Sequence, residues 1–238
     1  MTSWPTSPPI SPPSGDPEVS AGTAAITSEH PGITELFALL AYGEVAAFYR
    51  LTEEARMAPN LVGRINMASM AAAEMNHYEV LRAALERRGV DVVPAMTKYA
   101  AALENYHRLT TPSTWLEALV KTYIGDAMAA DFYLEIAGSM PPEAADVVRS
   151  VLSETGHSQF VVAEVRAAVT ASDKQRHRLA LWSRRLLGEA ITQAQYVLAD
   201  HDELVDLVMS GGGLSQLTEF FDRLQQTHST RIEELGLA

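Results

Sequence analysis

Apolar residues recur every three to four positions along four long segments of this chain. That spacing puts them on one face of an α-helix, and such a face has to be buried against other helices. The segments are residues 33–57, 60–88, 113–138 and 141–170. Because no stretch alternates apolar and polar residues long enough to predict a β-strand, we expect an all-α protein.

The order of these segments predicts a four-helix bundle. They form two pairs, and residues 90–112 make a long connection between the pairs. Two long antiparallel helix pairs joined by one long crossover are typical of ferritin-like bundles. A fifth helix over 173–199 and a last helix near 214–235 are expected as C-terminal additions.

Both ends of the chain differ in composition from its body, which we place at residues 29–200. Residues 1–28 are rich in Pro, Ser, Thr and Gly, so they bury little apolar surface and are expected to be disordered. Residues 201–238 are expected to form an acidic helical extension. From residue 200 onward the chain holds eight acidic and two basic residues, half of the formal net charge of −12.

Composition limits the functions open to the chain. With no cysteine, disulfides, thiolate zinc sites and iron–sulfur clusters are excluded, so a metal ion would need histidine and carboxylate ligands. The net negative charge disfavours a strongly basic nucleic-acid binder. No apolar run approaches the length of a membrane span, about 18 residues, and no secretory signal is found, so a cytoplasmic protein is expected.

Each of the four apolar stripes carries one carboxylate at a position that should be apolar. These carboxylates are Glu44, Glu74, Asp126 and Glu154. Four facing carboxylates could not all stay ionised without compensation, and bound cations are the usual compensation. His77 and His157 follow Glu74 and Glu154 by three residues, so each pair can reach one metal ion. The alternative is that these residues are exposed helical glutamates and satisfied core histidines.

The two halves of the bundle form a pseudo-repeat, which strengthens the metal interpretation. Glu44 precedes Glu74 by 30 residues, and Asp126 precedes Glu154 by 28. Each half thus supplies one carboxylate and one Glu-x-x-His, the pattern of di-iron and di-manganese carboxylate bundles. A third Glu-x-x-His, Glu104 to His107, lies in the connection without a matching carboxylate helix, and we do not expect it to bind metal.

On these residues the chain resembles the ferritin-like superfamily and, more narrowly, the MiaE-like family of tRNA-(2-methylthio-N6-isopentenyladenosine) hydroxylases. The resemblance spans residues 33–200 and includes the later segment 178–190. It implies a non-haem di-iron, or di-manganese, enzyme that activates O2 as a hydroxylase or monooxygenase. One ion would be held by Glu44, Glu74 and His77, and the other by Asp126, Glu154 and His157.

Asp126 departs from the all-glutamate pattern of that family. Aspartate is one methylene shorter, so the second ion is expected to sit differently, bind weakly or be absent. The donor set favours iron or manganese over zinc or copper, because oxygen ligands outnumber imidazoles.

The substrate and partners follow from the resemblance alone. A modified tRNA nucleoside would be approached through a basic segment whose charged members are Lys174, Arg176, Arg178, Arg184 and Arg185. A hydroxylase would also need an electron donor. Two alternatives stay open: a non-catalytic ferritin-like metal-binding or interaction protein, and a di-iron oxidase or desaturase of a lipid or small molecule.

Overall fold

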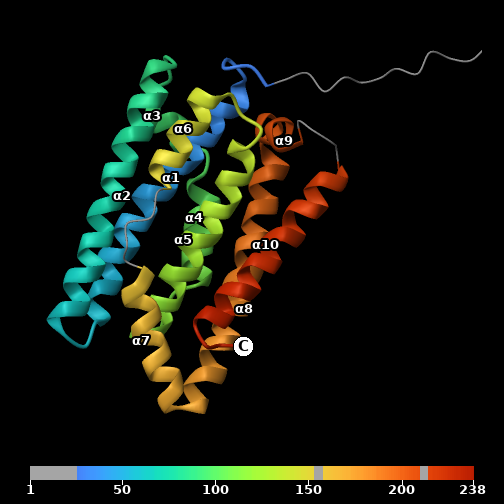
Figure 1. Ribbon diagram of the computed structural model, residues 1–238. Helices are drawn as coiled ribbons and strands as arrows, with labels where there is room; N and C mark the ends of the chain where they lie inside the picture. Colours follow the sequence, from blue (N-terminus) through green and yellow to red (C-terminus); the bar gives the residue numbers. More distant parts are fainter. Residues whose placement is uncertain (1–25, 153–157, 210–213) are drawn as a thin grey trace, which may run out of the picture.

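A computed structural model describes residues 26–152, 158–209 and 214–238 of the chain. Every regular element in these residues is a helix, and none is a strand, so the all-α prediction is confirmed. Long helices run side by side along the length of the molecule (Figure 1). Residues 1–25 lie outside the described chain, and the disorder expected for residues 1–28 stays a prediction.

The first helix pair consists of α1 (Pro31–Glu54) and α2 (Leu61–Arg87), joined through the short 3-10 helix η1 (Ala55–Met57). Asn60 starts α2 as its N-cap, because its side-chain oxygen accepts a hydrogen bond from the Gly63 amide at 2.9 Å. Just after α2, Gly89 takes a positive φ of 72°, a conformation that glycine adopts without strain.

The connection between the two pairs contains α3 (Val92–Thr97) and α4 (Ala100–Leu109). It leads into α5 (Trp115–Ala137), whose N-cap is Thr114. The predicted long crossover is therefore present and partly helical. Its second helix packs against α1 and α8, which closes one side of the bundle.

The fourth segment differs from its prediction as one helix over 141–170. The chain forms α6 (Pro142–Val151), leaves helical geometry after Val151, and forms α7 (Ser158–Ala171). The two pieces have different neighbours: α6 packs on α2 and α5, whereas α7 packs on α5 and α8. The expectation of one unbroken helix was wrong because these two packing surfaces lie at opposite ends of the molecule (Figure 1).

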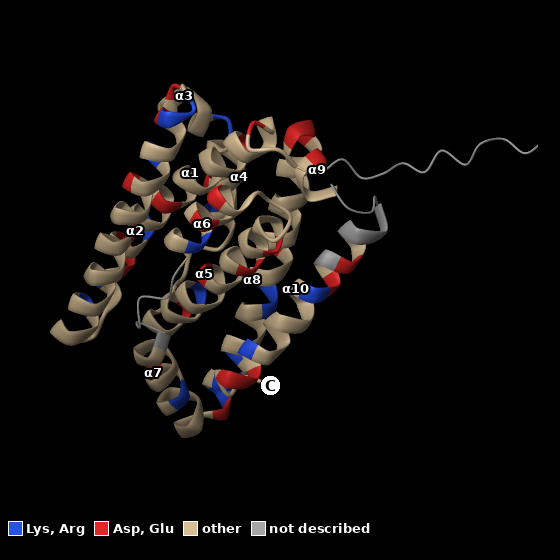
Figure 2. Ribbon diagram, turned by 45° about the horizontal axis from the view of Figure 1, so that its top comes forward, with Lys and Arg blue, Asp and Glu red and all other residues tan. Residues whose placement is uncertain are grey.

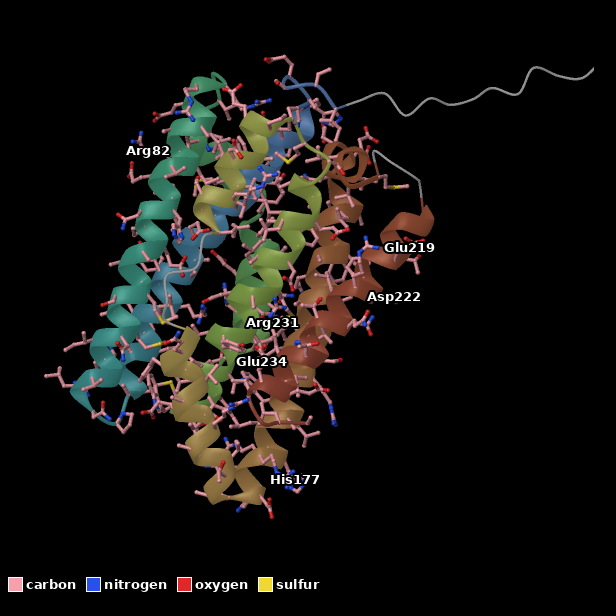
Figure 3. The ribbon with its side chains drawn as sticks, viewed as in Figure 1. Arg82, His177, Glu219, Asp222, Arg231 and Glu234 are labelled. Carbon is pink, nitrogen blue, oxygen red and sulfur yellow. The ribbon has the colours of Figure 1, made fainter. Side chains whose placement is uncertain are left out.

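Three helices complete the chain. The predicted fifth helix is α8 (Asp173–Asp200), capped by Ser172, and it is followed by α9 (Asp202–Met209) and α10 (Leu214–Glu234). In Figure 3, Arg231 and Glu234 of α10 lie toward α5. Arg231 makes a bidentate ion pair with Asp131, and Glu234 accepts a hydrogen bond of 2.5 Å from Tyr123.

One described segment, Pro31–Met57, has the length and the mean hydropathy, 1.2, of a membrane-crossing helix. Half of its most apolar window is buried inside the bundle, as in the core helix of a compact fold. Length and composition alone are weak evidence for a membrane span, and the expectation of a cytoplasmic protein stays a prediction.

Candidate metal centre

A polar layer divides the core of the bundle into two apolar clusters. One cluster takes in the first part of α1, the last part of α2 and the last part of α5, and the other takes in their opposite ends. Glu44 and Glu74 fall between the clusters on α1 and α2, and Asp126 of α5 lies between Ile124 and Met128 of the second cluster. Three of the four stripe carboxylates that the sequence marks thus line the same cavity, and the fourth, Glu154, lies outside the described residues.

Three of the six predicted ligands come together in this layer. His77 Nδ1 lies 3.3 Å from Glu44 Oε2 and 3.5 Å from Glu74 Oε2. One ligand atom from each of these residues lies within 4.8 Å of the others, a spacing suited to one metal ion. Glu44 is 8% exposed, and the side chains of Glu74 and His77 are 15% and 20% exposed.

The close contacts among Glu44, Glu74 and His77 shift the pKa of each side chain. Burial, reinforced by the neighbouring Glu74, raises the pKa of Glu44 well above its ordinary value. Burial also opposes ionisation of Glu74, but hydrogen bonds from His77 and Glu44 lower its pKa on balance. Hydrogen bonds to the two carboxylates raise the pKa of His77 to about 10. The raised pKa of Glu44 favours its protonated form, and the imidazolium of His77 lies against both carboxyl groups.

The donor set fits a divalent cation. In terms of ligand hardness, carboxylates are hard ligands and imidazole is intermediate. Two carboxylates and one imidazole therefore suit iron or manganese. Metal binding would release protons from Glu44 and His77, because a metal ligand has to be deprotonated. A bound ion would then supply the two positive charges that the protons supply in its absence.

The structure places Asp126 in a different set of contacts. Its Oδ1 lies 3.3 Å from Nη2 of Arg50, whose Nη1 lies 3.0 Å from both Glu54 Oε2 and Thr122 Oγ1. Burial raises the pKa of Asp126 to about 7, although Arg50 opposes this shift. The other two predicted ligands, Glu154 and His157, lie outside the described residues.

Sequence reasoning missed three charged residues of this layer. Arg50 and Glu54 are 8% and 6% exposed, and Lys121 is 2% exposed with its Nζ 3.8 Å from Glu54 Oε1. Burial and the charge of Arg50 lower the pKa of Lys121 to about 7. The four-residue spacing of Arg50 and Glu54 predicts an ion pair. The sequence does not show that this pair is buried.

The third Glu-x-x-His does not form a cluster in the described residues. Glu104 is exposed and accepts a hydrogen bond of 2.6 Å from the Tyr42 hydroxyl. His107 points into the protein, and its Nδ1 is buried without a hydrogen-bond partner in the described chain. Burial lowers the pKa of His107 to about 2, so its imidazole is neutral.

A cavity of about 380 Å³ adjoins the metal centre. Its charged and imidazole lining consists of Glu44, Glu74, His77, Asp126, Arg50, Lys121 and His107. Its apolar lining includes Met128 and Phe132 of α5, Leu187 and Ile191 of α8, and Phe221 and Leu224 of α10. The cavity therefore combines the charged groups of the candidate site with apolar side chains from the C-terminal helices.

The basic segment proposed for nucleic acid lies on the first half of α8. Arg178 pairs with Glu117 at 2.8 Å, Arg176 pairs with Asp173 at 2.6 Å, and Arg185 donates to the Leu109 carbonyl oxygen. Lys174 and Arg184 are exposed. His177, within this segment, lies at the α7–α8 end of the molecule (Figure 3), and charges of both signs follow α8 and α10 (Figure 2).

Comparison with known proteins shows which family the fold of this chain belongs to. The curated proteins give no match. Residues 29–211 match a protein family described as a ferritin-like domain of actinomycetes. The match supports the ferritin-like superfamily, whereas the narrower resemblance to the MiaE-like family stays a prediction. Since it covers more than half of the sequence, the chain belongs to this family of ferritin-like domains.

Proposed function

We propose that this protein binds iron, or manganese, at Glu44, Glu74 and His77 and works as an O2-activating, hydroxylase-like enzyme. The observation that carries the proposal is the meeting of these three side chains between the two apolar clusters. Buried carboxylates are costly unless they are paired or bind cations, so a stable fold keeps them for a reason.

The residues of the chain have separate roles in this proposal. Glu44 and Glu74 would hold the ion by charge, and His77 would add a neutral nitrogen after losing its proton. Bound iron would supply oxygen activation. The apolar side chains that line the cavity would favour an unactivated C–H group close to the candidate metal centre.

The two-metal form of the proposal adds Asp126, Glu154 and His157 as ligands of a second ion. It requires Asp126 to exchange the Arg50 guanidinium for that ion, because Asp126 Oδ1 is paired with Arg50.

For the substrate, we propose a modified tRNA nucleoside, on the resemblance to the MiaE-like family. The phosphates of the tRNA would be contacted by the basic segment of α8, namely Lys174, Arg176, Arg178, Arg184 and Arg185. The reaction would also need an electron donor, and we propose that it takes place in the cytoplasm. The cavity favours a second candidate, an oxidase or desaturase of a lipid or small molecule, because much of its lining is apolar. The third candidate function for the same fold is that of a non-catalytic protein that binds metal or a partner protein.

Metal analysis tests the core of the proposal. Protein treated with chelator, reloaded with Fe(II) without oxygen and freed of excess metal should retain iron, measured by mass spectrometry. Glu74→Gln should lower the affinity at least tenfold, because it removes a charged ligand. Glu79→Gln, on the same helix but 56% exposed at its side chain, is the matched control and should bind like the wild type. Wild-type protein without bound iron or manganese would refute the proposal.

The substrate is tested separately. Modified nucleosides in tRNA from a deletion strain and its parent should differ by one hydroxyl group on one nucleoside. Identical nucleoside profiles would remove the tRNA candidate and leave the lipid or small-molecule candidate in place.

A further inference from the structure

The guanidinium group of Arg50 is the most firmly held cation in the polar layer. It is anchored from two helices, with Glu54 on its own helix and Thr122 and Asp126 on α5. Its Nη1 makes both 3.0 Å contacts, and its Nη2 makes the contact with Asp126. A group fixed in this way is part of the built site rather than a mobile side chain in the cavity.

The charges of the described layer balance around a single divalent ion. The buried or cavity-lining carboxylates are Glu44, Glu54, Glu74 and Asp126, which carry four negative charges when ionised. Arg50 supplies one positive charge, and Lys121 supplies a second when it is protonated. One divalent ion at Glu44, Glu74 and His77 supplies the remaining two and leaves the described part of the layer neutral, a count that does not include Glu154, which lies outside the described residues.

Di-metal carboxylate bundles balance their charges differently. In that pattern, four glutamates face two divalent ions, and the histidines are neutral. Here two monovalent side chains stand against Glu54 and Asp126, where charge balance would otherwise need a second ion. A second divalent ion on Asp126 would lie beside the Arg50 guanidinium, 3.3 Å from Asp126 Oδ1, and the two cations would repel each other.

We propose that the Arg50 guanidinium, supported by Lys121, takes the place of a second metal ion, so that the protein carries a one-metal centre at Glu44, Glu74 and His77. This inference rests on the proposed metal function and narrows it. Asp126 is then a partner of Arg50 rather than a metal ligand. Its shorter side chain has a physical role, because Asp126 pairs with a large planar cation instead of reaching a metal ion.

Metal stoichiometry and one conservative variant test the inference. Full-length protein is stripped with chelator, titrated with Mn(II) and analysed for bound manganese per chain. We expect one ion per wild-type chain, with the electron paramagnetic resonance spectrum of an isolated Mn(II) ion. Asp126→Asn should keep that ion with an affinity within about threefold of wild type, whereas Glu74→Gln should lose at least tenfold.

Asp131→Asn is the matched control for Asp126→Asn. Asp131 lies on the same helix and is also paired with an arginine, Arg231, but outside the metal centre. Two manganese ions per wild-type chain, or an exchange-coupled spectrum, would overturn the inference and leave the metal function standing. Loss of the ion in Asp126→Asn, with Asp131→Asn unaffected, would also overturn it. Wild-type protein that binds no ion would overturn the metal function itself and the inference with it.

Discussion

Replacing Lys121 by methionine should stabilise the protein at neutral pH. The ammonium group is 2% exposed, and its nearest carboxylate oxygen, Oε1 of Glu54, is 3.8 Å away. Burial and the charge of Arg50 lower the pKa of Lys121 from 10.5 to about 7, although Glu54 and Asp126 act in the opposite direction. Methionine has a similar length and needs neither water nor a charged partner.

The size of the effect follows from this pKa. A fall of three and a half pKa units corresponds to at most about 5 kcal/mol of destabilisation of the charged form, at about 1.4 kcal/mol per unit. The variant also loses the contact with Glu54 and the position of the cation over the Tyr106 ring. We therefore expect a net gain of about 2–4 kcal/mol in the free energy of unfolding at pH 7.

The pH dependence gives a sharper signature than the gain itself. The pKa of Lys121 is lower in the folded protein than in the unfolded chain, so between pH 7 and 10.5 the unfolded chain binds more protons. Stability from this residue is therefore lowest below pH 7 and rises with pH across that window. Between pH 7 and pH 9 the wild type should recover about 2 kcal/mol relative to Lys121→Met.

Urea unfolding of chelator-treated protein, followed by circular dichroism at pH 7 and pH 9, measures both effects. Lys174→Met, at an exposed position of α8, is the matched control and should change stability by less than about 0.5 kcal/mol. A variant less stable than wild type at pH 7 would refute the reasoning. So would an advantage that is equally large at pH 9, because it would show that Lys121 does not titrate in this window.

Three further predictions concern helix packing and caps, each measured as a shift in the urea midpoint. Gly32→Ala should destabilise by about 1–3 kcal/mol, because a Cβ there would lie 2.3 Å from the Glu203 carbonyl oxygen of α9; an unchanged midpoint would contradict the close packing of α1 on α9. Gly188→Ala, in the middle of α8 with nothing within 4 Å of the added Cβ, should stabilise by about 1 kcal/mol, and a loss would contradict that open space. Asn60→Ala should cost about 1 kcal/mol by removing the N-cap bond to the Gly63 amide, whereas Asn60→Asp should keep most of the stability.

Helix periodicity and local end signals account for most of the fold. The α1–α2 pair, α5 and α8 all lie on segments that the apolar spacing predicts to be helical, and the structure caps α2, α5 and α8 with Asn60, Thr114 and Ser172. The division of the fourth segment into α6 and α7 was not predictable in the same way. Both pieces keep a helical spacing, and the break depends on which neighbouring helix each one contacts.

Of the six metal ligands predicted from the apolar stripes, three lie together in the structure. Glu44, Glu74 and His77 meet because an apolar stripe interrupted by a polar residue has to turn that residue inward. Asp126 also reaches the layer, where its partner among the described residues is Arg50, and its predicted co-ligands Glu154 and His157 lie outside those residues. A helical stripe predicts which residues face inward, and it does not predict which of them pair.

Arg50 shows where that limit lies. In the sequence it stands between Glu44 and Glu54 as an ordinary helical arginine, and its four-residue spacing to Glu54 is common on exposed helix faces. What gives it a role is the arrival of Thr122 and Asp126 from α5, more than 70 residues later in the chain. A buried arginine needs partners for its charge and its donors. Glu54, Thr122 and Asp126 partner the two terminal nitrogens of Arg50, whereas its Nε is buried without a hydrogen-bond partner in the described residues. Of these partners, Asp126 is the one that the sequence predicts as a ligand of a second metal ion. The shorter side chain of Asp126, visible in the sequence, and the buried guanidinium, visible only in the fold, are therefore two parts of one arrangement.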